Sequence, residues 1–409
     1  MKFSLAVIGQ GYVGLPLAIR AANSGVTTVG IDVDLQWIEK IINGSDDIEQ
    51  VEVSELRSAQ KLGHYKASGE FGMVAQANVV AICVPTPLDR DENPDLTFLT
   101  SAIAGFAQFL RPGTLVILES TSFPGTMREV VIPEVLKHSD LKASELHFAF
   151  SPERIDPGNA TWNVHNTPKI VSGASERDLE LATDFYSTFM ENVVPVKSLE
   201  VAEMAKLLEN TFRQINISFI NEFAQLCESF GISVWDVIDA AATKPFGFTR
   251  FNPGIGIGGH CIPVDPHYLN WKLNQLGKSS RFIDLASEVN NSMPQYIATR
   301  ALELVSKPIK DTSCLVVGLT YKPNVADLRE SPSIDLITHL REQGVNVKWH
   351  DSLINQWNGE ISTALNSGYD LIILVHEHDG TDLDVILSGR VPIFDCTGRY
   401  RELPSVTTL

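Results

Sequence analysis

The sequence predicts an α/β protein in which a long central helix joins two doubly wound domains, each built on a parallel sheet. Three observations support this prediction. A glycine-rich turn lies between an apolar strand-like run and a helical run near the N-terminus, residues 200–230 show helical spacing without proline or glycine, and strand-like runs begin again after Lys307. A chain of 409 residues exceeds what one core usually supports. We expect domains at residues 1–198, 199–305 and 306–409.

The first domain carries the elements of a Rossmann-like dinucleotide-binding fold in order. A strand is expected over residues 3–8, and Gly9-Gln10-Gly11-Tyr12-Val13-Gly14 follows directly before a helix over residues 15–22. The first glycine makes the turn, the second admits a pyrophosphate, and the third lets the helix pack on the sheet. A second strand over residues 27–31 ends at Asp32, which would bind a ribose 2′-hydroxyl and repel a 2′-phosphate. The pattern favours NAD over NADP, and a ligand-free glycine turn is the alternative.

Polar side chains follow the later strands of this domain. Ligands of open α/β sheets lie outside the carboxyl ends of the strands, so Thr86 and Thr121 are candidates for cofactor contact. Threonine in such turns is also a common helix cap. Glu153 and Arg154 follow the last strand and form either an active-edge acid and guanidinium or a surface ion pair. The strands concerned are expected over residues 78–84, 115–118 and 147–150.

The long helix carries two residues that could stabilise negative charge on oxygen. Lys206 and Asn210 are four residues apart and therefore share a helix face, with Arg213 a turn further on. A lysine supplies charge and an asparagine supplies an amide donor to an alkoxide or a tetrahedral oxyanion. A solvated helix face is the alternative.

One cysteine lies in a position that suits chemistry better than packing. Cys261 ends a loop with four glycines, and Asp265 follows one short turn later. Glycines allow positive φ and let backbone amides approach a ligand, so we expect an exposed thiol, with His260 as the adjacent group that could favour its thiolate. The alternative is a tight turn with an incidental cysteine. The other cysteines are assigned to packing: Cys83, Cys227, Cys314 and Cys396.

The second half of the sequence predicts another α/β domain, whose sheet binds a different ligand. Its glycine pattern is broken, so we expect the nucleotide end of another ligand and not a second dinucleotide. Lys322, Arg329 and Arg399 stand at strand ends or in the following loops, which suggests a phosphorylated ligand. Lys244 and Arg250 lie beside aromatic residues before the cysteine loop and suit a nucleotide, although a plain loop is also open. Strands are expected over residues 313–317, 345–349, 370–375 and 393–395, and a helix over residues 333–343.

Composition excludes several classes of function. A formal net charge of -18 argues against a nucleic-acid partner or an anionic membrane surface. Five widely spread cysteines suggest a reducing compartment, and apolar runs are far shorter than the ~20 residues of a membrane span. We therefore expect a cytoplasmic protein without a membrane or metal site.

These motifs together resemble the UDP-glucose/GDP-mannose dehydrogenase family over nearly the whole chain. The motifs that carry the resemblance are GQGYVGLP, STSFPGT, SPERIDPG, AKLLENTFR, GIGIGGHCIPVDP and YKPNVADLRESP. Within the family, GGHCIPVDPHYL and YKPNVADLRESPS resemble the branch that acts on UDP-N-acetylhexosamines, whereas the glucose enzymes usually carry serine before the cysteine.

The resemblance implies oxidation of the C6 alcohol of UDP-GlcNAc or UDP-ManNAc to the carboxylate with two equivalents of NAD. It implies covalent catalysis through a thiohemiacetal and a thioester, charge stabilisation on oxygen, and an acid/base group that works with water-positioning residues. Cys261 would be the covalent nucleophile, and Lys206 and Asn210 would stabilise the charge on oxygen. Glu153 would be the acid/base group, and Thr121 and Asp265 would position the water. NAD contacts are expected at Gly9, Gly11, Tyr12, Val13, Gly14, Asp32, Thr86, Thr121 and Arg329. Substrate contacts are expected at Arg154, Ile155, Lys206, Asn210, Arg213, Arg250, Gly258, Lys322 and Arg399.

In relatives the loop that carries Arg250 can reach a neighbouring subunit's site, so the resemblance also implies a homodimer or a higher homo-oligomer. Three alternative functions stay open. One is a UDP-glucose 6-dehydrogenase, another is a two-electron β-hydroxyacid-type dehydrogenase that has no use for a thiol, and the third is a non-catalytic NAD-dependent sensor.

Overall fold

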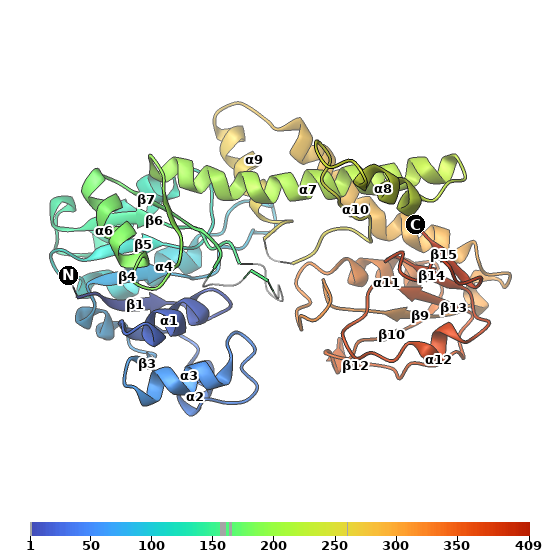
Figure 1. The fold of residues 1–409 in the computed structure, drawn as a ribbon, viewed down its shortest axis with the longest axis horizontal. Helices are drawn as coiled ribbons and strands as arrows, with labels where there is room; N and C mark the ends of the chain where they lie inside the picture. The colour runs from blue at the N-terminus through green and yellow to red at the C-terminus, as the bar shows by residue number, and fades with distance from the viewer. Residues whose placement is uncertain (1, 156–160, 163–165, 260) are drawn as a thin grey trace. The chain divides into compact units, whose positions relative to one another are not determined.

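The computed structural model describes residues 2–155, 161–162, 166–259 and 261–409. The chain forms two compact units. The first unit contains residues 1–208 and 271–276, and the second unit contains residues 209–270 and 277–409. Figure 1 labels their elements. The three domain ranges expected from the sequence stay a prediction.

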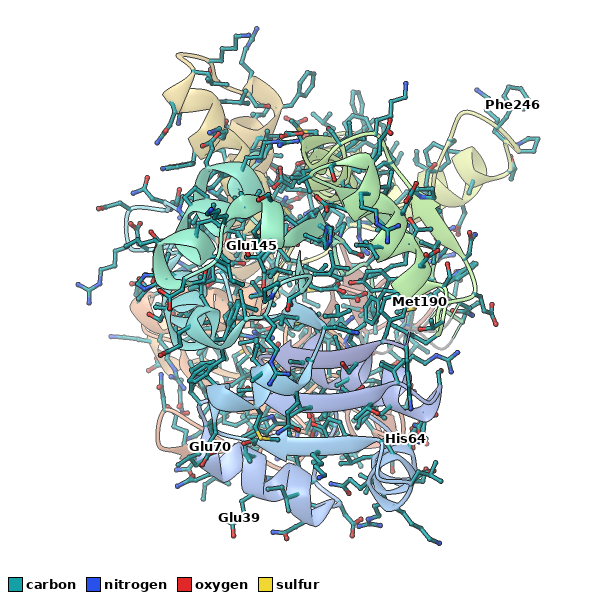
Figure 2. All side chains as sticks on the ribbon, turned by 90° about the vertical axis from the view of Figure 1, so that its left-hand side faces the viewer. Glu39, His64, Glu70, Glu145, Met190 and Phe246 are labelled. Carbon is teal, nitrogen blue, oxygen red and sulfur yellow. The ribbon has the colours of Figure 1, made fainter. Side chains whose placement is uncertain are left out.

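The first unit is built on a sheet of mixed direction. Its order is β3-β2-β1-β4-β5-β6-β7-β8 in the described residues, and neighbours are parallel except that β7 runs antiparallel to β6. Alternate residues of β1 enter different cores: Leu5 and Val7 contact the core that α1 covers, whereas Ala6 and Ile8 contact the core that α4 covers. Figure 2 shows Glu39 of α2 pointing away from this unit.

The strands of the first unit are β1 Ser4–Ile8, β2 Thr27–Ile31, β3 Tyr65–Ser68, β4 Val79–Ile82, β5 Leu115–Leu118, β6 His147–Phe150, β7 Lys169–Gly173 and β8 Val193–Pro195. Its helices are α1 Gly14–Asn23, α2 Leu35–Asn43, α3 Val53–Lys61, α4 Thr97–Phe106, α5 Ile132–His138 and α6 Glu176–Tyr186.

The second unit is built on a parallel sheet of order β10-β9-β13-β14-β15. Helices cover both of its faces, because Cys314 and Val316 of β9 share a core with α10 and α11, whereas Leu315 and Val317 share one with α12. The strands are β9 Ser313–Val317, β10 Asn346–His350, β13 Leu371–Leu374, β14 Ile393–Asp395 and β15 Val406–Thr408, with a hairpin of β11 Gln356–Trp357 and β12 Glu360–Ile361. The helices are α8 Val234–Ala242, α10 Arg281–Leu302, α11 Pro332–Glu342 and α12 Asp384–Leu387.

Helix α7 runs from Leu199 to Ser229 and confirms the long helix predicted over residues 200–230. It begins in the first unit and ends in the second. Helix α9, Asp265–Gln275, follows the cysteine loop. No helix among the described residues has both the length and the apolar character needed to cross a membrane.

The predicted fold class is confirmed, and each predicted strand and helix is present with ends that differ by at most two residues. The sequence pattern did not predict β3, β7, β8 or β15. Strands β3, β8 and β15 are short edge strands with partly exposed side chains, so their apolar pattern is weak, whereas β7 is buried but begins with a lysine and ends with a glycine.

Candidate functional site

The glycine turn after β1 leaves room for a pyrophosphate at one position. A Cβ added to Gly9, at φ +91°, would lie 2.6 Å from the Cys83 carbonyl oxygen, and one added to Gly14 would lie 1.8 Å from the Gly9 carbonyl oxygen. A Cβ added to Gly11 would meet nothing within 4 Å. Gly9 and Gly14 therefore serve the turn and the packing of α1, while Gly11 leaves the open approach that NAD requires.

Asp32 is held at the end of β2 in a pose that suits a ribose. Its Oδ2 accepts the Gln10 amide at 2.7 Å and its Oδ1 accepts the Asp34 amide at 3.0 Å. Each carboxylate oxygen retains lone-pair capacity for a hydroxyl. Gln10 is itself buttressed, because the Tyr65 hydroxyl donates to its Oε1 at 2.8 Å and the Trp37 indole donates to its carbonyl at 2.8 Å. The sequence pattern did not single out Gln10, since that position of the motif is variable by definition.

Thr86 and Thr121 join the turns after β4 and β5. The Thr86 hydroxyl donates to the Thr121 carbonyl at 2.7 Å, and neither residue caps an α-helix, so the capping alternative is wrong. Glu203 of α7 then holds the second turn: its carboxylate accepts the amides of Gly125 at 2.6 Å and Met127 at 3.0 Å. Sequence reasoning missed Glu203, because its partners lie more than seventy residues away.

Glu153 is a mostly buried carboxylate and not half of a surface ion pair. Its side chain is 14% exposed, and Oε1 accepts the amides of Arg154 at 2.6 Å and Ile155 at 2.7 Å. Oε2 accepts from the Lys169 ammonium at 3.3 Å. Burial raises the pKa of Glu153, but the charge of Lys169, these amides and the charge of Lys206 together hold the pKa below its usual value. The Arg154 guanidinium donates to the Pro168 carbonyl at 2.7 Å.

Lys206 and Asn210 are both buried, so the solvated-face alternative is wrong. Arg213, further along α7, is exposed. Asn210 donates through its side-chain amide to the Asp265 carboxylate, and the Asp265 amide donates to the Cys261 carbonyl at 2.8 Å. The second unit thereby brings together three residues that the sequence analysis had assigned to catalysis.

The exposure of the cysteines separates one thiol from the rest. Cys261 is exposed, whereas the other four are buried, as predicted. Burial raises the pKa of each of these four thiols, so they stay protonated and inert. His260, the expected neighbour of the reactive thiol, lies outside the described residues.

The glycines before Cys261 are in close contact with another segment of the same chain. Gly256 and Gly259 have φ of +128° and +86°, which confirms the predicted positive φ. A Cβ on Gly258 would lie 2.5 Å from the Glu330 carbonyl oxygen, and one on Gly259 would lie 2.7 Å from the Tyr321 ring. At Gly258 and Gly259 the segment after β9 therefore occupies the space that a side chain would take, and a ligand contact of their backbone stays a prediction.

A cavity of about 290 Å³ opens at the carboxyl ends of the second sheet. Lys322 and Arg399, both predicted to bind a phosphorylated ligand, line it together with Tyr321, His376 and Glu377. The Arg399 guanidinium pairs with Glu377 at 2.5 Å. Cations and aromatic surface meet in this cavity, which suits a nucleotide.

Two predicted cations lie outside the lining of this cavity. Arg329 is bonded to the Asp327 carboxylate at 2.6 and 3.0 Å, and Arg250 pairs with Asp239 at 2.6 Å. Arg250 follows a loop whose aromatic tip is exposed, and Figure 2 shows Phe246 projecting from that loop.

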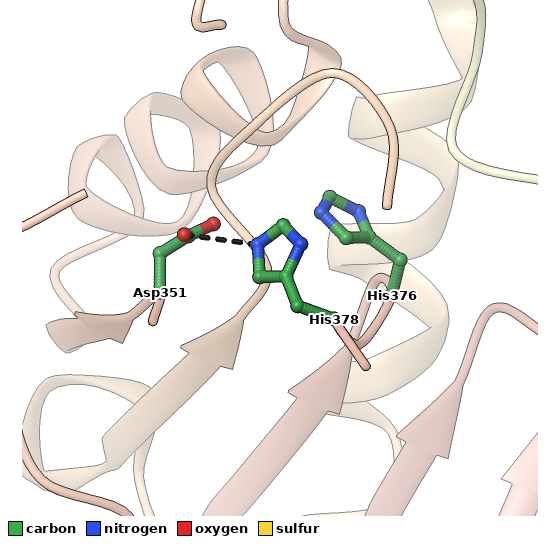
Figure 3. Close-up of side chains that lie close together, drawn as sticks. All are labelled: Asp351, His376 and His378. Carbon is green, nitrogen blue, oxygen red and sulfur yellow. Dashed lines mark hydrogen bonds and ion pairs between the residues drawn. The ribbon is translucent and has the colours of Figure 1, made fainter. Parts of the chain in front are cut away.

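Three buried polar residues, Asp351, His376 and His378, lie close together (Figure 3), and His376 also lines the cavity. The Asn324 amide donates to His378 Nδ1 at 2.8 Å, so the neutral ring carries its proton on Nε2 and donates to Asp351 Oδ1 at 2.9 Å. The Thr320 hydroxyl donates to the Lys322 carbonyl at 3.1 Å and therefore accepts from His376 Nε2 at 2.9 Å. With both Nε2 atoms as donors, the three residues form a hydrogen-bond network with Thr320 and Asn324.

Comparisons with known proteins agree with this arrangement. Models of the UDP-glucose/GDP-mannose dehydrogenase family match the NAD binding domain over residues 3–190, the central domain over residues 200–292 and the UDP binding domain over residues 315–396. The chain is 35% identical over 382 residues to the UDP-N-acetyl-D-mannosamine dehydrogenase of Methanococcus maripaludis, a match that covers 92% of this chain and 86% of that protein. It is 34% identical over 388 residues to the UDP-N-acetyl-D-glucosamine 6-dehydrogenase of Pseudomonas aeruginosa, covering 91% of this chain and 90% of that protein.

The solved structure of UDP-D-ManNAc dehydrogenase from Pyrococcus horikoshii superposes with a TM-score of 0.87 at 32% identity, covering 96% of this chain and 95% of that one. Sequence motifs, fold and domain matches thus point the same way over almost the whole chain. The protein therefore belongs to the UDP-glucose/GDP-mannose dehydrogenase family and carries that family's NAD-binding and UDP-binding domains.

Proposed function

We propose that this protein is a nucleotide-sugar 6-dehydrogenase that oxidises the C6 alcohol of a UDP-N-acetylhexosamine, UDP-ManNAc or UDP-GlcNAc, to the carboxylate. The names of the relatives at 34–35% identity support this substrate class. The observation that carries the proposal is the exposure of Cys261 alone among five cysteines, next to Asp265 and its partner Asn210. A two-electron dehydrogenase would not need this thiol.

Cys261 supplies the nucleophile. After the first oxidation the substrate carries an aldehyde at C6, and the thiolate adds to its carbonyl carbon to form a thiohemiacetal. The second oxidation converts this adduct to a thioester, and water then releases the carboxylate and restores the thiol. When bound, NAD takes up a hydride in each oxidation, so two equivalents are consumed per sugar.

The remaining catalytic residues handle charge and protons. Lys206 and Asn210 stabilise the oxygen charge that develops when the alcohol loses its proton and when the thiolate adds. Glu153, whose lowered pKa keeps it ionised, acts as the base, and Thr121 and Asp265 position the hydrolytic water.

The binding residues fall into two sets. The turn Gly9–Gly14 and Asp32 hold NAD, with Tyr12, Val13, Thr86 and Arg329 as further contacts. Lys322 and Arg399 hold the diphosphate of the nucleotide, because both line the cavity of the second unit. Further substrate contacts are Arg154, Ile155, Arg213, Arg250 and Gly258.

Substrate and thiol are tested together by measuring NADH from purified protein with UDP-ManNAc, UDP-GlcNAc, UDP-GalNAc, UDP-glucose and GDP-mannose. We expect the N-acetylhexosamines to react best and to yield two NADH per sugar. Cys261→Ser should stop complete oxidation, and Cys83→Ser, at a buried thiol, is the matched control. Full turnover by Cys261→Ser with one NADH per sugar would support the two-electron alternative. A preference for UDP-glucose would contradict the proposed substrate class and support a UDP-glucose 6-dehydrogenase.

We also propose a homodimer formed through α7. Phe212, Phe219 and Leu226 recur every seven residues along α7 and are each about half exposed, at 49%, 58% and 50%. Phe282 and Leu285 of α10 are exposed as well. A repeat of this spacing suits the packing of a second identical helix. A cytoplasmic location is part of the same proposal, since five free cysteines suit a reducing compartment.

A further inference from the structure

A buried charged cluster lies directly behind Glu153 in the first unit. Lys169, the first residue of β7, is buried, and its ammonium pairs with the Glu119 carboxylate. The same ammonium lies 3.3 Å from Glu153 Oε2 and 3.3 Å from the Pro152 carbonyl oxygen. The Tyr186 hydroxyl donates to the other oxygen of Glu119. All three donors of the lysine are thus directed at acceptors.

Sheet register explains why Lys169 meets Glu153. Strands β6 and β7 are antiparallel and pair Ala149 with Gly173 and Phe150 with Ser172. Extending this register by three residues sets Lys169 opposite Glu153. Glu119 reaches the same point because it directly follows β5, the other neighbour of β6. The cluster is therefore built by the sheet itself.

A buried cluster of charged residues contributes little to the stability of the fold. Removing an ammonium and carboxylates from water costs several kcal/mol per ion, and well-packed apolar groups are often at least as stable in its place. The hydrogen bonds offset part of this cost but do not account for the choice of charged residues. What the cluster adds beyond stability is control of the charge on Glu153.

We propose that Lys169 is a positioning residue that keeps Glu153 ionised and fixes its orientation, while Glu119 and Tyr186 hold the lysine in place. The inference rests on the proposed role of Glu153 as the base of the reaction. It adds the reason why a carboxyl that is 14% exposed carries a full charge there.

The charged and titratable groups around Glu153 come from several elements. Lys169 of β7 and Lys206 of α7 are the cations whose charges lower its pKa. Glu119, after β5, is a second carboxyl in the cluster, and burial raises its pKa. Cys83, after β4, is a buried thiol whose pKa burial also raises, so it is uncharged. Lys169 is the cation that is hydrogen-bonded to Glu153, and its removal should therefore have the larger effect.

The test compares the protonation of Glu153 in Lys169→Met with that in the wild type. The midpoint is read from the carboxylic-acid band of infrared difference spectra, with Glu153→Gln as the subtracted reference. Loss of an opposite charge at this distance should raise the midpoint by at least about one pH unit. The acid limb of kcat should move to higher pH with it, because only the ionised form acts as a base. An unchanged midpoint would overturn the inference.

Matched variants separate charge from structural damage. Lys169→Arg keeps the positive charge and should hold the midpoint near the wild-type value even if kcat falls. Glu119→Gln removes a neighbouring negative charge and must not raise the midpoint, whereas simple disruption of the cluster would raise it. If Lys169→Met does not fold, Lys169→Met with Glu119→Gln removes the cation and its partner charge together. A smaller rise in the midpoint is then expected, because the loss of the Glu119 charge offsets part of the loss of the hydrogen-bonded lysine.

The two proposals fail separately. Full sugar oxidation by Glu153→Gln would refute the role of Glu153 as the base, whatever Lys169 does. Loss of activity in Glu153→Gln together with a wild-type midpoint in Lys169→Met would refute only the role of Lys169.

Discussion

Replacement of His376 by glutamine should reduce the loss of stability of the second unit in mild acid. His376 is buried, and its pKa is lowered from 6.5 to about 4, first by burial and then by the charge of His378, with Asp351 acting weakly in the opposite direction. Between these two values the unfolded chain binds a proton that the folded chain does not bind. The free energy of unfolding therefore decreases as pH falls through this window.

The magnitude follows from the two pKa values. For a pKa of about 4 in the folded state and 6.5 in the unfolded state, lowering the pH from about 7 to about 5 costs about 2 kcal/mol. Glutamine does not titrate, and its amide can still donate to Thr320 Oγ1 in place of the imidazole Nε2. The variant should therefore lack this part of the pH dependence, whatever other groups contribute to both proteins.

Urea unfolding at both pH values, read by hydrogen exchange of β9 and β13 amides, measures the effect in the unit that contains His376. The quantity of interest is the difference between wild type and His376→Gln in their loss of unfolding free energy. His339→Gln, at a partly exposed histidine of α11, serves as the control. Equal losses in wild type and His376→Gln would refute the reasoning, because they would mean that His376 accepts its proton equally well in both states.

Three other predictions concern packing and assembly. Glu203→Ala leaves two buried amides without their acceptor and should lower the free energy of unfolding of the first unit by about 2–4 kcal/mol, measured by urea denaturation. Gly259→Ala should abolish oxidation and destabilise the second unit, because its Cβ would meet the Tyr321 ring, whereas Gly113→Ala, at the same φ of +86° in open space, should cost only about 1 kcal/mol. Phe219→Asp should weaken the proposed dimer at least about a hundredfold, measured by sedimentation over a range of concentrations, and an unchanged mass would exclude this face of α7 from the interface.

Local patterns predicted most of the fold and part of the site. The glycine turn, Asp32 and the long helix depend on short-range spacing, which the sequence displays directly. Cys261 could be separated from the other cysteines because its neighbours are glycines and prolines, and theirs are strand and helix residues. Asn210 and Asp265 were both predicted, but their hydrogen bond joins positions 55 residues apart and could be found only in the structure.

Long-range partners account for what the sequence did not predict. Lys169 precedes a short apolar run that gives no sign of a reversed strand, so its pairing with Glu153 could not be read from the pattern. Gly258 and Gly259 looked like space for a ligand, yet the contacting chain comes from residues 321–330, more than sixty positions away. Spacing identifies a conformation, but the identity of what fills the neighbouring space depends on tertiary structure.

The reversal of β7 has a consequence for how this enzyme could be altered. In a parallel strand the residue at the catalytic edge is the last one, and the following loop can be lengthened freely. Here the ammonium enters at the start of the strand, and the ladder to β6 sets its position. Inserting a single amino acid early in β7 would bring Ile170 or the inserted residue to that point and turn the lysine toward the opposite side of the sheet. Natural length variation should therefore be tolerated before residue 169 and rejected within the strand.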